Sequence, residues 1–238
     1  MKILVFQHLD CEHPGSLRGH LDRDGVQWDV VELDQSEAIP PLEGYDALWV
    51  MGGPMDVWDT EEHPWLIDEK AAIRTWVREL KRPYLGLCLG HQLLADALGG
   101  TCAPQTPPEV GIMQVELTEA GREAPLFDGL AHRQTCLQWH GVQVAELPEG
   151  AAVLATSGSC AIQAMRVGER AWSMQYHIEV EPDTVRNWAA IPAYEQALIE
   201  TMGETGLNRL QQDSDAAMPG FLDASARIYR NFMQLVRK

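Results

Sequence analysis

The chain has 238 residues, 45% of them hydrophobic, and a formal net charge of −17 at pH 7. This length accommodates one large α/β domain with a well-buried core, or two small domains. With 35 acidic residues against 18 basic ones, binding to nucleic acid or to an anionic membrane is not expected, because both need clustered Lys and Arg.

The cysteine content and the N-terminus indicate the compartment. The five cysteines include no CxxC pair, which fits a reducing compartment and argues against a structural zinc site. The N-terminal run Met1–Phe6 is too short for the apolar core of a signal peptide, and no apolar run approaches transmembrane length. We therefore expect a cytoplasmic protein with no metal and no organic cofactor.

The first hundred residues alternate between short apolar runs and amphipathic segments. Buried strands are predicted over Ile3–Phe6, Trp28–Leu33, Ala47–Met51 and Tyr84–Leu87. Helices are predicted over Leu17–Asp24, Pro64–Leu80 and Leu89–Leu98. This alternation predicts an α/β fold with a doubly wound, mostly parallel sheet and helices on both faces. Functional residues are then expected at the carboxyl ends of the strands.

The pattern changes after Gly100. Residues 101–110 contain three prolines and are predicted to be a loop. Short strands, with antiparallel hairpins between them, are predicted over Ile112–Leu117, Thr135–Trp139, Val153–Ala155, Ala161–Val167 and Ala171–Tyr176. From Asp183 the spacing is helical again, with breaks expected near Gly206 and at Pro219-Gly220. We expect one domain over residues 1–185, with residues 186–238 as its helical C-terminal extension.

Cys88 lies where the strand Tyr84–Leu87 turns into a helix, between Gly86 and Gly90. Small residues allow a tight turn that exposes the side chain, as in a nucleophile elbow. The adjacent helix N-terminus favours the reactive thiolate. Small core residues are the expectation for the other cysteines, Cys11, Cys102, Cys136 and Cys160.

A cysteine nucleophile needs a base, and the base needs a group that orients it. His177 directly follows a predicted strand, and Glu179 lies two residues further on. Residues i and i+2 of an extended segment point the same way, so the carboxylate can hold the imidazole in one tautomer. Solvated loop positions are expected for the remaining histidines considered, His8, His13, His20, His63 and His132.

Three segments resemble the motifs of class I, triad-type glutamine amidotransferases. They are Gly86–Gln92, Met174–Val180 and Met51–Pro54, and they match in order and spacing over roughly residues 1–185. The chain is most similar to the glutaminase domain of GMP synthetase and its stand-alone relatives. The resemblance implies a flavodoxin-like glutaminase fold, with Cys88 as nucleophile, His177 as base and Glu179 as its orienting carboxylate.

The same resemblance implies a substrate site. The Gly52-Gly53 turn and Leu89 are expected to supply backbone N–H groups to the oxyanion. Contacts with the bound glutamine are expected from Gln92 and from the pair His140 and Gly141.

The chain departs from the family pattern at two positions. Trp139 stands where a small polar residue is usual, and Ile178 stands where proline is usual. Ile178 removes no reactive group. Trp139 affects the shape of the substrate site.

Three functions follow as expectations. In the first, Cys88 attacks the γ-amide of glutamine and forms a γ-glutamyl thioester, the ammonia passes to an acceptor, and a separate synthetase subunit is a possible partner. In the second, the same triad hydrolyses γ-glutamyl peptides, an alternative that Trp139 favours. In the third, the protein binds a partner through its helical C-terminus and has no catalytic activity.

Overall fold

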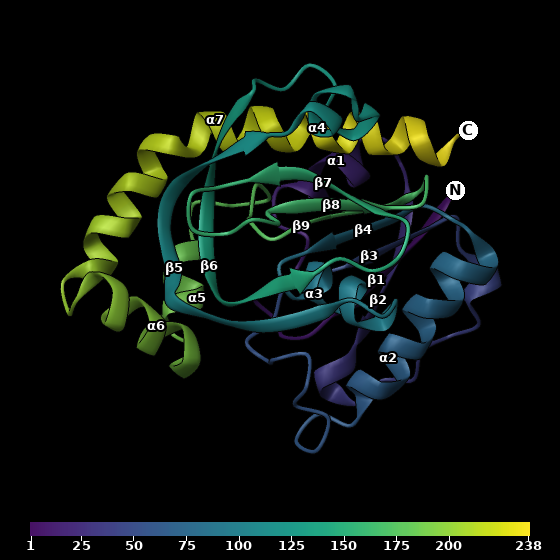
Figure 1. Ribbon diagram of the computed structural model, residues 1–238, viewed down its shortest axis with the longest axis horizontal. Helices are drawn as coiled ribbons and strands as arrows, with labels where there is room; N and C mark the ends of the chain where they lie inside the picture. Colours follow the sequence, from purple (N-terminus) through teal and green to yellow (C-terminus); the bar gives the residue numbers. More distant parts are fainter.

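The computed structural model describes all residues, 1–238, and is built around a single nine-stranded sheet (Figure 1). The strand order is β2-β1-β3-β4-β9-β8-β7-β5-β6. The strands are β1 (Lys2–Gln7), β2 (Gln27–Glu32), β3 (Ala47–Val50), β4 (Tyr84–Leu87), β5 (Thr101–Leu117), β6 (Arg133–Glu146), β7 (Ala151–Thr156), β8 (Ala164–Val167) and β9 (Ala171–Met174). All the predicted strands are therefore present, several with different bounds.

The sheet is mixed. Strands β2, β1, β3, β4 and β9 run parallel, through four pairings. Four further pairings join β9, β8, β7, β5 and β6, and all of these are antiparallel. The prediction of a doubly wound, mostly parallel sheet is confirmed only as far as the α/β class, because parallel winding ends at β9.

Helices cover both faces of the parallel strands. On one face lie α1 (Leu17–Arg23) and the long C-terminal helix α7 (Gly206–Val236), which contact each other and pack on one buried apolar cluster. On the other face lie α2 (Trp65–Arg74) and α3 (Leu89–Ala97), which pack on a second buried apolar cluster. Helix α2 continues as a π-helix over Thr75–Leu80. Figure 1 shows α7 and α2 on opposite sides of the sheet.

The prediction of a loop over residues 101–110 is wrong, because β5 begins at Thr101 and pairs with β6 along most of its length. The prolines are accommodated where this pairing shifts register, between Pro104 and Glu109. Proline lacks the N–H that a ladder needs, so it is tolerated at such an irregularity. The short helix α4 (Glu119–Glu123) follows β5.

The C-terminal region forms α5 (Thr184–Ala189), α6 (Pro192–Met202) and α7. The break expected near Gly206 is present, since α7 starts there, but the break expected at Pro219-Gly220 is not. Pro219 and Gly220 lie on the exposed side of α7, while Phe221, close by, is fully buried. Packing of the apolar face against the sheet thus outweighs the local cost of proline within the helix.

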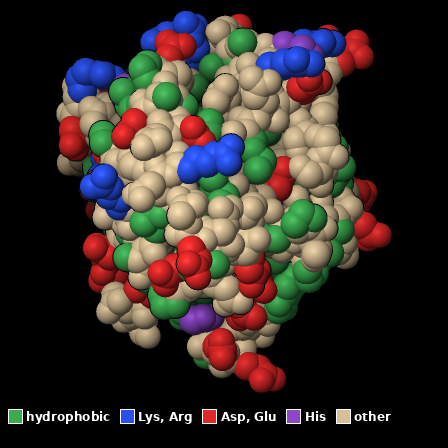
Figure 2. All heavy atoms as spheres, turned by 90° about the vertical axis from the view of Figure 1, so that its left-hand side faces the viewer, with side chains coloured by type: hydrophobic (Ala, Val, Ile, Leu, Met, Phe, Trp, Pro, Cys, Tyr) green, Lys and Arg blue, Asp and Glu red, His purple; other side chains and the backbone are tan.

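Charge is unevenly distributed over the end of the molecule that carries α5 and α6. The Lys and Arg side chains lie in the upper half of this face, whereas Asp and Glu side chains are spread over both halves (Figure 2). None of the helices is both long and apolar enough to cross a membrane.

Candidate active site

Cys88 occupies the turn between β4 and α3 in a backbone conformation that non-glycine residues rarely adopt, with φ 50° and ψ −104°. Gly86 and Gly90 make this turn possible. A Cβ on Gly90 would clash with the main-chain oxygen of Val50, and one on Gly86 would clash with the carbonyl of Gly90. The strained backbone presents the Cys88 thiol at the carboxyl end of the parallel strands, beside the N-terminus of α3.

Cys88 is 5% exposed, and besides His177 its sulfur has two polar neighbours. The side-chain amide of Gln175 donates to Sγ at 3.6 Å, and the thiol faces the main-chain oxygen of Trp139 at 4.0 Å. Gln175 is not among the site residues predicted from the sequence. It stands two residues before His177 at the end of β9, so its placement in a strand-end motif was the signal available.

His177 and Glu179 form a tight buried pair. Nδ1 of His177 lies 2.6 Å from Oε1 of Glu179, and Oε2 of the same carboxylate accepts the backbone N–H of Ile178 at 2.9 Å. Burial acts to lower the pKa of His177, but the Glu179 carboxylate and the Cys88 thiol outweigh it and raise the pKa well above its usual value. The arrangement therefore favours an imidazolium beside the sulfur, with Nδ1–H donated to Glu179.

The backbone N–H groups of Gly53 and Leu89 make no hydrogen bond with any other group of the protein. Gly53 lies against the side chain of Leu89, so the backbone N–H groups of these two residues belong to neighbouring segments next to Cys88. The carbonyl of Gly52 instead accepts a hydrogen bond from Nδ1 of His8 at 2.8 Å. Two free N–H donors beside a nucleophile form a geometry that suits an oxyanion.

His8 is not the solvated loop residue that was expected. It directly follows β1, is fully buried, and lies 2.9 Å from Oε1 of the equally buried Glu69 in α2. Burial acts to lower the pKa of His8, yet Glu69, with help from the Gly52 carbonyl, raises it above the usual value. The sequence prediction failed because the partner lies 61 positions away.

The resemblance assigned Gln92 to substrate binding, and its side chain lines the same cavity as Cys88. Its amide group is engaged within the protein, donating to the carbonyl of Val142 at 3.1 Å and to Gln175 at 3.2 Å. Gln92 therefore ties α3 to β6 and to the residue that contacts the Cys88 sulfur.

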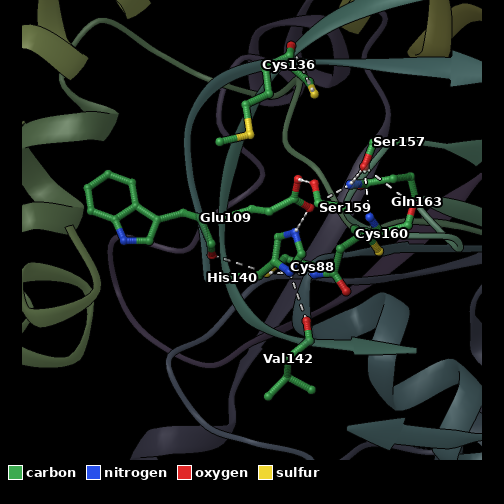
Figure 3. Close-up of polar contacts among 12 residues, drawn as sticks. Cys88, Glu109, Cys136, His140, Val142, Ser157, Ser159, Cys160 and Gln163 are labelled. Carbon is green, nitrogen blue, oxygen red and sulfur yellow. Dashed lines mark hydrogen bonds and ion pairs between the residues drawn. The ribbon is translucent and has the colours of Figure 1, made fainter. Parts of the chain in front are cut away.

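His140 lies on β6, with its imidazole held between two groups (Figure 3). Nδ1 donates to the carbonyl of Val142 at 2.9 Å, and Nε2 lies 3.1 Å from Oε2 of Glu109. Glu109 also accepts hydrogen bonds from Ser159 and Gln163. Burial opposes ionisation of Glu109, but the contacts of its carboxylate with His140 and Ser159 prevail and hold its pKa below the usual value. The predicted loop over residues 101–110 gives no reason to single out Glu109, which in fact lies on β5.

A cavity of about 160 Å³ joins these elements at the carboxyl end of the sheet. Its lining includes Cys88, Gln92, the predicted pair His140 and Gly141, and Gly53 of the glycine turn. Trp139 also lines it, with its indole packed edge-on against Trp188 of α5 at 5.9 Å between ring centroids. No three His, Cys, Asp or Glu side chains are grouped so as to hold a metal ion.

Comparison with known proteins places this site within a family. The sequence matches the family model for class-I glutamine amidotransferases over residues 9–187. A subunit of the glutamine-hydrolyzing GMP synthase of Saccharolobus solfataricus is 33% identical over 171 residues, which are 70% of this chain and 86% of the relative. The putative glutamine amidotransferase-like protein YfeJ of Salmonella typhimurium is 31% identical over 207 residues, 86% of this chain and 85% of the relative.

Solved structures share the fold over the whole chain. A glutamine amidotransferase from Thermotoga maritima has a TM-score of 0.86 at 24% identity and covers 100% of this chain and 99% of its own. A second, from Methylobacillus flagellatus, has a TM-score of 0.85 at 24% identity and covers 98% of this chain and 94% of its own. The matched family model and relatives span most of the chain. The chain belongs to the class-I glutamine amidotransferase family.

Proposed function

We propose that the protein hydrolyses the γ-amide of glutamine through a γ-glutamyl thioester on Cys88 and delivers the ammonia to an acceptor. The observation that carries this proposal is the meeting of a strained strand-to-helix cysteine with the buried pair of His177 and Glu179. This is the nucleophile, base and orienting carboxylate that acyl transfer through sulfur requires.

The reaction proceeds in two halves. The Cys88 thiolate attacks the amide carbon, and the N–H groups of Gly53 and Leu89 bind the oxyanion that forms. The imidazolium of His177 gives its proton to the departing nitrogen, which leaves as ammonia, and the thioester remains. His177 then takes a proton from water, the resulting hydroxide attacks the thioester, and glutamate leaves as the thiol is restored.

A partner follows from the relatives. The related GMP synthase chains of Saccharolobus solfataricus and Sulfolobus acidocaldarius each carry the name of one subunit of that synthase. By analogy, this chain would supply ammonia to a separate synthetase subunit that binds the acceptor. A cytoplasmic location remains a prediction from the cysteine content.

Ammonia release from glutamine tests the proposal. We expect the purified protein, alone or with its co-purified partner, to release ammonia and glutamate in equal amounts, and Cys88→Ala to release none. Gln196→Leu, a change on the exposed side of α6, serves as the control and should leave the rate unchanged. Absence of glutaminase activity in the wild type with every partner would contradict the proposal.

Hydrolysis of γ-glutamyl peptides is the second candidate. Trp139 stands where the family motif has a small polar residue, and its side chain is buried against the C-terminal helices. A bulky aromatic side chain therefore bounds the cavity at a position where the motif predicts a small one. The chemistry at Cys88 is the same, and only the departing amine differs. A higher specificity constant for glutamine than for γ-glutamyl peptides would count against this candidate.

A further inference from the structure

Helix α6 forms one wall of the cavity that contains Cys88. Its residues Ala193, Tyr194 and Ala197 line that cavity. The family model ends at residue 187, so these side chains lie outside the segment that carries the recognisable motifs. In Figure 1, α5 and α6 lie at the end of the sheet toward which β4 points, which is the end where Cys88 is placed. The C-terminal extension therefore contributes directly to the site.

Tyr194 fixes α6 in this position. Its hydroxyl donates to the buried carboxylate of Glu12, and its main-chain oxygen accepts the indole N–H of Trp139 at 3.2 Å. Its ring packs against Trp139 and Trp188, with centroid distances of 5.8 and 5.9 Å. Because Tyr194 is only 7% exposed, these contacts define a fixed wall of the cavity.

Trp188 and Glu12 connect this wall to His177. The ring of Trp188, just before α6, meets the His177 imidazole edge-on at 4.5 Å between centroids. Glu12, which holds Tyr194, interacts electrostatically with both His177 and Glu179. Tyr194 and Cys88 line the same cavity, so the phenol lies near the reacting thiol.

In the proposed reaction His177 protonates the departing nitrogen, so any substituent on that nitrogen lies close to His177 and to the groups packed around it. We propose that Ala193, Tyr194 and Ala197 form the subsite for the leaving amine and set the size of amine that the site accepts. This inference rests on the proposed function. Two alanines flank the aromatic ring, so a larger residue at Ala197 would take up the room available to the amine.

A graded series of substrates tests the subsite. The specificity constant kcat/KM is measured for glutamine, γ-glutamylmethylamide and γ-glutamylethylamide, whose departing groups are ammonia, methylamine and ethylamine. The variants are Ala197→Leu, which narrows the wall, and Tyr194→Ala, which opens it. Gln196→Leu adds the same side chain to the exposed side of α6 and is the matched control. Circular dichroism and thermal melting establish that each variant is folded.

If the wild type accepts the ethylamide, we expect Ala197→Leu to lower the ethylamide-to-glutamine ratio of kcat/KM by about tenfold or more. If it accepts only glutamine, we expect Tyr194→Ala to raise that ratio by about tenfold or more. The Gln196→Leu ratio should stay within about twofold of the wild type. Unchanged ratios in both wall variants, with activity on glutamine retained, would overturn the subsite alone. No turnover of any amide by the wild type would overturn the proposed function, and the subsite with it.

Discussion

At the scale of single residues, Glu179 is the side chain whose role can be separated from folding. Glu179→Gln keeps the size of the side chain but removes the charge that supports the imidazolium of His177, and the amide can accept only one of the two hydrogen bonds that the carboxylate accepts. In a serine-protease triad, the analogous loss of the carboxylate charge costs about four orders of magnitude in turnover. We predict a smaller loss, about ten- to a thousand-fold in kcat, because a thiol ionises more readily than a hydroxyl.

Steady-state kinetics of the folded variants measures this loss. Glu181→Gln removes a nearby carboxylate that pairs with Arg18 instead, and should retain wild-type turnover. His177→Ala should cost more than Glu179→Gln. A Glu179→Gln variant as fast as the wild type would reduce the triad to a dyad of Cys88 and His177.

The pH profile tests the same pair differently. Burial acts to lower the pKa of His177, but Glu179 and Cys88 outweigh this effect and raise it. The imidazolium therefore persists at pH values above 6.5, the usual pKa of histidine. Protonation of the leaving nitrogen should thus be lost only as pH rises through the raised pKa. We predict an alkaline limb of kcat/KM above pH 6.5, which Glu179→Gln moves to lower pH. An alkaline limb that is unmoved by this substitution would argue against an electrostatic role for Glu179.

At the scale of elements, the buried pair of His8 and Glu69 joins the end of β1 to α2 and holds the Gly52 carbonyl. His8→Ala leaves a buried carboxylate without its partner, so we predict a loss of about 3 kcal/mol in the free energy of unfolding near pH 6. The pKa of His8 is raised on folding, so its contribution is complete below pH 6.5 and is lost as pH rises through the raised value.

Chemical denaturation at several pH values measures this contribution. The difference between the wild type and His8→Ala should shrink as the pH increases. The exposed His132 offers a matched control, since His132→Ala should change the free energy of unfolding by less than about 0.5 kcal/mol. Equal effects of the two substitutions would contradict a role for His8 in joining these elements.

At the scale of the whole molecule, the C-terminal extension is part of the main core. Ala224, Ile228 and Phe232 of α7 belong to the same buried cluster as residues of β1, β3 and β4. Truncation after Pro182 should therefore expose this face of the sheet and abolish cooperative thermal unfolding. A truncated chain that melts cooperatively would show instead that residues 1–182 fold independently.

Much of this arrangement could be predicted because the motifs directly follow strands. Gly52, Cys88 and His177 come after β3, β4 and β9, three neighbouring parallel strands whose carboxyl ends share one edge. Contacts between residues far apart in the sequence, which only packing brings together, leave no comparable pattern in the sequence. These include the ion pair of His8 with Glu69, the position of Glu109 on β5, and the wall that α6 builds beside Cys88.

The central claim is that Cys88 is the nucleophile that accepts the γ-glutamyl group. Intact-protein mass spectrometry after treatment with a glutamine-like chloroketone tests it most directly, with peptide mapping to locate the adduct. We predict one adduct per chain, on Cys88, with parallel loss of ammonia release, protection by glutamine, and no adduct in Cys88→Ala. Labelling of Cys11 or Cys102 instead, or an unmodified chain that still hydrolyses glutamine, would contradict the account.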